Sequence, residues 1–188
     1  WSSDVCSSDL GEITDDLRIR AAVPTLQFLV EHGAIVTACN DMFFGSRHNL
    51  IMPGRGVNMG DGWETRRSRR PGPDWVILRL ATQGVIERIE VDTTHFKGNA
   101  PESCSIAVCD AGDHPSADLL TSDRPYTEIL PRAKLLPHAR HFFERELTAR
   151  VPATHVRFSI FPDGGVSRLR LWGTVTPEGR LSAGLQRL

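Results

Sequence analysis

The stretch Trp75-Val76-Ile77-Leu78-Arg79-Leu80 decides the fold class, because it is an almost continuous apolar run of strand length. We predict that this buried strand ends at Gly84, since an isolated glycine is a common strand terminator. Val85 to Val91 is predicted as a second strand, with Ile89 and Val91 on one face and Glu90 on the other. Two successive strands separated by a turn signal favour an antiparallel β architecture.

Further strands are predicted toward the C-terminus. The first is Cys104 to Val108. Two more strands are predicted at residues 154–161 and 166–172. Between them lies Pro162-Asp163-Gly164-Gly165, which is typical of a hairpin turn. Only Ala139 to Ala149 is predicted as a helix in this part of the chain. Several short strands with turn signals between them indicate a mainly β fold, either a β-sandwich or a jelly roll.

The predicted hairpin fixes a register that brings charges together. A turn centred on Asp163-Gly164 sets three cross-strand pairs: Ser159 with Arg168, Arg157 with Arg170, and His155 with Trp172. The apolar residues of both strands then share the other, core-facing side: Val156, Phe158, Ile160, Leu169 and Leu171. Opposed like charges destabilise a sheet. The arginine pair therefore needs structural salt bridges, a ligand or subunit contact, or full solvation.

The composition is that of an ordinary globular protein with one domain. The 188 residues are 40% hydrophobic and 24% charged, and the net charge is −1, so no overall field favours nucleic acid or an anionic membrane. No apolar run approaches the ~18 residues of a membrane span. The N-terminus also lacks the basic start and apolar stretch of a secretory signal. We therefore expect a cytoplasmic protein with neither nucleic-acid nor membrane partners.

The four cysteines, Cys6, Cys39, Cys104 and Cys109, have no CxxC pair and no zinc-type spacing. Cys104 and Cys109 have an odd separation within one predicted strand, so their side chains are expected on opposite faces. We predict reduced thiols, as is usual in the cytosol.

Residues 1–32 differ in character from the rest of the chain. The first ten, WSSDVCSSDL, contain a near-duplication and look like translated sequencing adapter, so residues 1–10 are set aside as a disordered artefact. In residues 11–32 a helical segment is predicted, with Thr14 as its N-cap, a break at Pro24 and a stop at Gly33.

The string GEITDDLRIRAAVPTLQFLVEHGA, which begins at Gly11, resembles the early segment of phosphoglycerate kinases. In that family the arginine that matches Arg18 contributes to binding the phosphoglycerate. The Asp-Phe-Asn motif that should precede the string and the His-Leu-Gly-Arg-Pro motif that should follow it are missing here, and so is the nucleotide site. Our hypothesis is a chimaeric sequence, joined near Gly33, in which residues 33–188 form the β domain.

Three blocks carry a second resemblance: Asp61-Gly62-Trp63-Glu64-Thr65-Arg66-Arg67, Val91-Asp92-Thr93-Thr94-His95-Phe96-Lys97-Gly98-Asn99 and Phe161-Pro162-Asp163-Gly164-Gly165-Val166-Ser167-Arg168-Leu169-Arg170. They closely resemble signature segments of allantoicases and occur in the family's order. The resemblance implies a galactose-binding-like jelly roll and hydrolysis of allantoate to ureidoglycolate and urea, with no cofactor. Family members carry two such domains in tandem, and this chain resembles the C-terminal one. A second repeat domain and a homo-oligomer are therefore expected in the intact enzyme.

The chemistry of that reaction selects the candidate site residues. A carboxylate substrate calls for arginines that can grip it in a bidentate fork, and cleavage of the C–N bond calls for a carboxylate or histidine that moves protons. The candidates for proton transfer are Glu64, Asp92 and His95. The candidates for substrate binding are Arg66, Arg67, Lys97, Asn99, Arg168 and Arg170. No metal ligands are assigned.

Other interpretations remain open for several of these residues. The arginine-rich run that follows Glu64 can be a solvated loop, and His95 can be bonded to Asp92 merely to shape a turn. The HxxH spacing of His138 and His141 fits two metal ligands on a helix or two surface residues. For the whole chain, the alternatives are a non-catalytic β-sandwich module that binds a ligand and a fragment of phosphoglycerate kinase.

Overall fold

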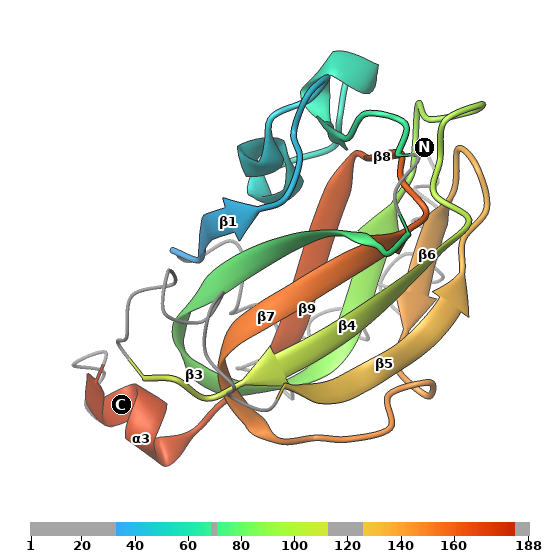
Figure 1. The fold of residues 1–188 in the computed structure, drawn as a ribbon. Coiled ribbons are helices and arrows are strands. Elements are labelled where there is room, and N and C mark those ends of the chain that lie inside the picture. The colour runs from blue at the N-terminus through green and yellow to red at the C-terminus, as the bar shows by residue number, and fades with distance from the viewer. Residues whose placement is uncertain (1–32, 69–70, 113–125, 183–188) are drawn as a thin grey trace, which may run out of the picture.

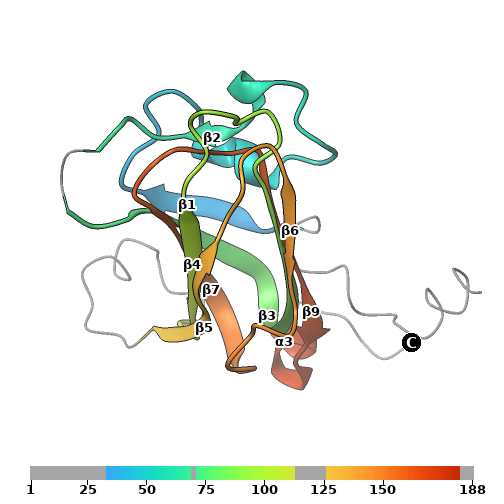
Figure 2. The ribbon, with the colours of Figure 1, turned by 90° about the vertical axis from the view of Figure 1, so that its right-hand side faces the viewer.

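The structure, a computed structural model, describes residues 33–68, 71–112 and 126–182. The predicted adapter artefact and the predicted helical segment 11–32 lie outside these residues. The described elements are β1 (Ile35–Cys39), η1 (Arg47–Ile51), η2 (Met59–Asp61), β2 (Trp63–Glu64), β3 (Asp74–Asp92), β4 (Ser103–Cys109), β5 (Thr127–Lys134), β6 (Arg140–Phe143), β7 (Pro152–Phe161), β8 (Gly165–Val166), β9 (Arg168–Val175) and α3 (Pro177–Ser182). They form a two-layer β-sandwich, which confirms the predicted fold class (Figures 1 and 2).

Strand β3 is the centre of the sandwich, because each of its halves belongs to a different layer. The first half pairs antiparallel with β1 and β7, and β7 continues the layer through β4 to β5. The second half pairs antiparallel with β9 and β6. The prediction of two strands that separate at Gly84 is wrong. Gly84 instead pairs with both Ala153 and Val175, so the strand passes from one layer to the other without a break.

The core lies between the two layers and is filled by the inward-facing residues of both. Ile89 and Val91 are fully buried in it, as the alternation predicts. The five apolar residues predicted to face the core are also buried: Val156, Phe158, Ile160, Leu169 and Leu171. At 25 cal/mol per Å² of apolar surface, a fully buried side chain of this size contributes roughly 1.5–3 kcal/mol.

The cysteines of β4 face opposite sides of their sheet, as predicted. Cys104 belongs to the main core, whereas Cys109 packs with Ala111 and Tyr126 in a separate cluster. Cys39, Cys104 and Cys109 are free thiols. Burial raises the pKa of Cys104 to about 12, so this thiol is unreactive at neutral pH.

The predicted helix Ala139–Ala149 is wrong. Residues 140–143 form β6, whose four residues pair with β3 from Ile89 to Asp92. The remainder runs through turns and irregular backbone to β7. The edge of β3 opposite β9 has backbone groups that need partners, and pairing with them outweighs the local helical spacing of residues 139–149.

The predicted hairpin between residues 154–161 and 166–172 is also wrong. Strand β7 pairs with β3 and β4 in one layer, and β9 pairs with β3 in the other. Between them, Gly165 and Val166 pair with β2, which carries the chain across the end of the sandwich. Arg157 therefore lies opposite Ala107, not opposite Arg170.

One end of the sandwich carries the long connections, and the other carries α3 (Figures 1 and 2). The first end holds β2, β8, η1 and η2. Asn49 fixes this end by donating from Nδ2 to the carbonyl oxygens of Gly60 and Gly62, at 3.3 and 3.0 Å. No helix among the described residues has the length and apolar character needed to cross a membrane.

Candidate functional site

The outer side of β9, β3 and β6 carries charges at alternate positions. Glu90 and Asp92 of β3 point away from the core, because their neighbours point into it. The pairing with β9 places Arg170 opposite Glu90. It also places Arg168 opposite Asp92, and β6 adds Arg140 on the other flank of Asp92. Two rows of opposite charge thus meet on one face of the sheet.

This face is hollowed into a cavity of about 240 Å³. The lining residues are Gly54, Arg55, Glu90, Asp92, Arg140, Arg168, Arg170 and Trp172. Four arginines against two carboxylates give the lining a net positive charge, which favours a small anion. The sequence prediction contributed Asp92, Arg168 and Arg170 to this site, and the structure adds the others.

Both carboxylates in the lining are buried and paired. Asp92 is 2% exposed and accepts a hydrogen bond from the backbone N–H of Thr94 at 2.8 Å. Glu90 is also buried and accepts from Nε of Arg140 at 2.6 Å. That hydrogen bond is the main cause of the raised pKa of Arg140. Burial with fixed partners holds both carboxylates in defined positions beside the cavity.

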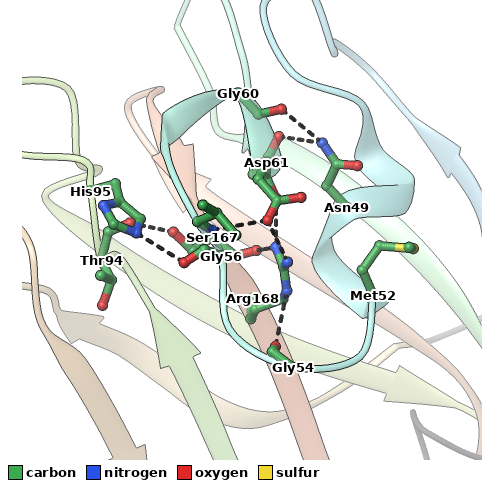
Figure 3. A network of polar contacts seen from close by, with 12 residues as sticks. Asn49, Met52, Gly54, Gly56, Gly60, Asp61, Thr94, His95, Ser167 and Arg168 are labelled. Carbon is green, nitrogen blue, oxygen red and sulfur yellow. Dashed lines mark hydrogen bonds and ion pairs between the residues drawn. The ribbon is translucent and has the colours of Figure 1, made fainter.

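Arg168 is 3% exposed and ties the cavity floor to a long connection (Figure 3). Its Nε donates to the carbonyl oxygen of Gly54 at 3.2 Å. Its two terminal nitrogens donate to Asp61, one to the carbonyl oxygen and one to the carboxylate at 2.9 Å. The backbone N–H of Val57 and then Arg168 hold the pKa of Asp61 below its ordinary value.

Arg170 anchors the same connection. It donates to the carbonyl oxygens of Leu50 at 3.2 Å, Met52 at 2.5 Å and Gly54 at 2.8 Å. We call residues 50–61 the arginine-anchored loop. Carbonyl oxygens and the Asp61 carboxylate thus accept hydrogen bonds from the two guanidinium groups. Most of their donors are occupied by this loop. The predicted cross-strand pairs Ser159 with Arg168 and Arg157 with Arg170 are wrong, because β9 pairs with β3.

His95 holds the loop at another point. Its Nε2 lies 2.9 Å from the carbonyl oxygen of Gly56, and because a carbonyl only accepts, this nitrogen carries the proton. Its backbone N–H donates to Nδ1 of His138 at 2.9 Å. With φ at 77°, His95 occupies the left-handed region that non-glycine residues rarely adopt. The predicted partner Asp92 bonds to Thr94 instead.

A second group of predicted residues lies at the loop end of the sandwich, around Glu64. Its Oε1 accepts from Nδ2 of Asn99 at 2.5 Å. The same Nδ2 lies 3.9 Å from the sulfur of Met59. Glu64 and Asn99 are both half-buried, so the pair is accessible from outside. We call it the Glu64–Asn99 pair.

The other basic candidates lie close in sequence to this pair, since Arg66 and Arg67 follow Glu64 and Lys97 precedes Asn99. Arg66 bonds to the carboxylate of Asp41 through its backbone N–H at 2.6 Å and its Nε at 3.1 Å. Its guanidinium also stacks over the ring of Phe43 at 4.9 Å. Arg67 and Lys97 are exposed. The predicted residues therefore divide between the cavity and the Glu64–Asn99 pair, with His95 bound to the loop that lines the cavity.

The HxxH spacing does not create a metal site here. Nδ1 of His138 accepts from His95, and Nε2 of His141 accepts from the backbone N–H of Leu136 at 2.8 Å. The other nitrogen of His141 lies 3.1 Å from the carbonyl oxygen of Val91. Within the described ranges, no group of three potential metal ligands is found.

The three charged lining residues that the sequence analysis did not select were missed for different reasons. Glu90 was already placed on the outer face, but nothing local marked that face as a cavity. Arg140 was assigned to a helix, which concealed its position beside Asp92. Arg55 lies in the arginine-anchored loop, which has no periodic pattern.

A family model described as the allantoicase repeat matches residues 28–176. The match begins five residues before the predicted boundary at residue 33. The allantoicase of Dictyostelium discoideum is 53% identical over 143 residues, which cover 76% of this chain and 38% of that protein. Among solved structures, the allantoicase of Saccharomyces cerevisiae has a TM-score of 0.66 at 38% identity. That comparison covers 79% of this chain and 43% of the yeast chain.

More distant structures share the fold alone. An F5/8 type C domain from Bacteroides fragilis has a TM-score of 0.59 at 13% identity, and covers 81% of this chain. This likeness supports the galactose-binding-like sandwich. The chain spans about two fifths of the length of the allantoicases that it matches.

Proposed function

The chain belongs to the allantoicase family, and on this premise we propose that it is one repeat of an allantoicase. The proposed activity is hydrolysis of allantoate to ureidoglycolate and urea. The observation that carries the proposal beyond the family is the positively charged cavity beside two fixed carboxylates. Allantoate presents a carboxylate to the arginines and ureido N–H groups to the carboxylates.

We propose the following roles in the cavity. Arg55 and Arg140 bind the substrate carboxylate, since Arg168 and Arg170 use most of their donors on the loop. In the reaction, water oxygen replaces one ureido nitrogen on the central carbon, and the departing urea nitrogen gains a proton. Asp92 lines the cavity and is the proposed carrier of that proton.

The remaining candidates keep their predicted roles as proposals. Glu64 and His95 are proton-transfer candidates, and Arg66, Arg67, Lys97 and Asn99 are substrate-binding candidates that stand nearer the Glu64–Asn99 pair. We further propose a cytoplasmic enzyme that acts together with a second repeat and as a homo-oligomer. The free thiols of Cys39, Cys104 and Cys109 support a reducing compartment.

The test is urea release from allantoate, measured for the chain alone and for the chain supplied with a second allantoicase repeat. We expect Asp92→Asn to lower turnover about 100-fold or more, as for loss of a general acid or base. The matched control is Glu128→Gln, which changes an exposed carboxylate on β5. Normal turnover of a folded Asp92→Asn variant would remove Asp92 from the mechanism.

Two other functions give different results in the same experiment. A non-catalytic module would bind allantoate in calorimetry but release no urea, whether the chain is alone or supplied with a second repeat. A phosphoglycerate kinase fragment has support only from residues 11–32, which lie outside the described residues. ATP binding by the chain would favour that function.

A further inference from the structure

Phe142 is an exposed aromatic residue on the outer face that carries the cavity. Its neighbour Phe143 is buried in the core, so the alternation of β6 points Phe142 outward together with Arg140. Phe142 is 44% exposed and is not one of the residues that line the cavity. Because little of this apolar side chain is removed from water, burial does not account for its position. Its contacts with charged side chains do.

Two guanidinium groups lie over the ring of Phe142. The Cζ atom of Arg140 is 5.0 Å from the ring centroid, and that of Arg88 is 4.9 Å from it. Arg88 also lies 5.2 Å from the ring centroid of Trp172, which lines the cavity. At such distances a cation is attracted to the face of an aromatic ring. The outer face thus carries a row of four contacting side chains: Trp172, Arg88, Phe142 and Arg140.

Arg140 is held from a second direction by Glu90. Its Nε donates to the buried Glu90 carboxylate at 2.6 Å. A single hydrogen bond fixes one atom of the planar guanidinium group, and the contact with the Phe142 ring restricts the orientation of its plane. The two contacts together define the direction in which the terminal nitrogens of Arg140 point.

These terminal nitrogens are left for another partner. In the described part of the chain they donate no hydrogen bond, and the Arg140 side chain is 43% exposed where it lines the cavity. Arg55 lines the cavity too, but its side chain forms no hydrogen bond or ion pair with residues 33–68, 71–112 or 126–182. Arg140 therefore combines a fixed position with available donors.

We propose that Phe142 is a positioning residue for carboxylate binding. Its ring holds the plane of the Arg140 guanidinium, so that the two terminal nitrogens form a preorganised bidentate fork at the cavity. Phe142 acts through Arg140 and does not touch the ligand. The inference deepens the proposed function and rests on the role that it gives to Arg140, but a simple carboxylate can probe the same fork without turnover.

NMR spectroscopy of the arginine Nε–H groups in the ligand-free 188-residue chain tests the geometry. Nitrogen relaxation gives an order parameter for the Arg140 Nε–H group, and we expect Phe142→Leu to lower it. Sodium acetate is then titrated as the carboxylate probe. Phe142→Leu should raise the dissociation constant of acetate about twofold to fivefold, the factor that one exposed cation–π contact is worth. Phe142→Tyr keeps the ring and should match the wild type in both measurements.

A double-mutant cycle separates positioning from a general effect on structure. In the Arg140→Ala background, adding Phe142→Leu should not change the residual binding of acetate. The matched control is Tyr126→Leu, which removes the ring that lies 4.7 Å from the guanidinium of Arg157, in the other layer. It should change neither the Arg140 order parameter nor acetate binding. Circular dichroism should show that every variant is folded.

An unchanged order parameter and unchanged acetate binding in folded Phe142→Leu overturn the proposal. So does an effect of Phe142→Leu that persists in the Arg140→Ala background, and so does a wild type whose Arg140 signal does not respond to acetate. In urea release, Phe142→Leu should raise KM and leave kcat nearly unchanged. Since acetate binding needs no turnover, absence of urea release in the wild type counts against the proposed function and not against the positioning role of Phe142.

Discussion

At the scale of single residues, Arg168 is expected to matter for stability before it matters for chemistry. Its buried guanidinium holds Gly54 and Asp61 of the arginine-anchored loop. Arg168→Ala would leave the Asp61 carbonyl oxygen without a donor and would remove the charged partner of the Asp61 carboxylate, which would keep only the backbone N–H of Val57. We predict a loss of about 3 kcal/mol in the free energy of unfolding, measured by urea denaturation.

The control for this prediction is Arg150→Ala, which removes an exposed arginine. It should change the free energy of unfolding by less than about 0.5 kcal/mol. If Arg168→Ala is as stable as this control and yet fails in urea release, Arg168 acts on the substrate and not on the loop.

Asp61 makes stability depend on pH in a defined direction. Its pKa in the folded protein lies below the ordinary value of 3.8, first because of Val57 and then because of Arg168. The folded state therefore binds its proton less readily than the unfolded state. The stabilisation is complete above the unfolded pKa and disappears as the pH falls through the folded pKa.

Asp61→Asn should remove this dependence. We expect the difference in urea midpoint between the wild type and the variant to be largest near neutral pH, and to shrink below about pH 4. A difference that stays constant down to pH 2 would mean that the Asp61 carboxylate is not the source.

At the scale of elements, the crossing from β7 to β9 depends on Gly165. A Cβ at this position would lie 1.9 Å from Cε1 of Phe96, whose side chain is fully buried. Gly165→Ala should therefore lower the free energy of unfolding by about 2–3 kcal/mol, measured by thermal or urea unfolding. Gly98→Ala is the matched control, because its Cβ would meet nothing within 4 Å. Equal stability of the two variants would show that Phe96 can move aside.

The same crossing explains where sequence reasoning succeeded and failed. Alternation placed the apolar residues of β7 and β9 in the core correctly, because the period of a strand decides which face a side chain is on. The partners were wrong, because a Pro-Asp-Gly-Gly turn does not reveal that Gly165 pairs with β2. The pairing of residues 140–143 with β3 likewise depends on strands distant in the sequence.

For the candidate site, the sequence predicted which residues belong to it better than it predicted which of them contact one another. Glu64 and Asn99 were chosen separately, yet they bond across 35 residues of sequence. The cavity was not predicted, because it needs the register of three strands together with a loop that covers two arginines. Arg170 was recognised as needing a partner, through its predicted pairing with Arg157, but its backbone carbonyl partners cannot be predicted from side-chain patterns.

At the scale of the whole molecule, β3 should make unfolding cooperative. Both layers share this strand, so disruption of β3 removes hydrogen bonds from both of them. We predict that circular dichroism of the strands and tryptophan fluorescence, to which the buried Trp63 contributes, follow one urea transition. Two separated midpoints would indicate that the layers open independently.

The arginine-anchored loop has a consequence for evolvability. Arg168, Arg170 and His95 grip it through carbonyl oxygens, and a carbonyl is the same whatever residue carries it. A substitution at Arg55, which lines the cavity, can therefore alter the cavity wall while leaving the attachment of the loop intact. Insertions and deletions in the loop break this attachment, because they shift the carbonyl oxygens away from their donors. A repeat built in this way can acquire new ligand preferences by substitution, provided that the length of the loop stays the same.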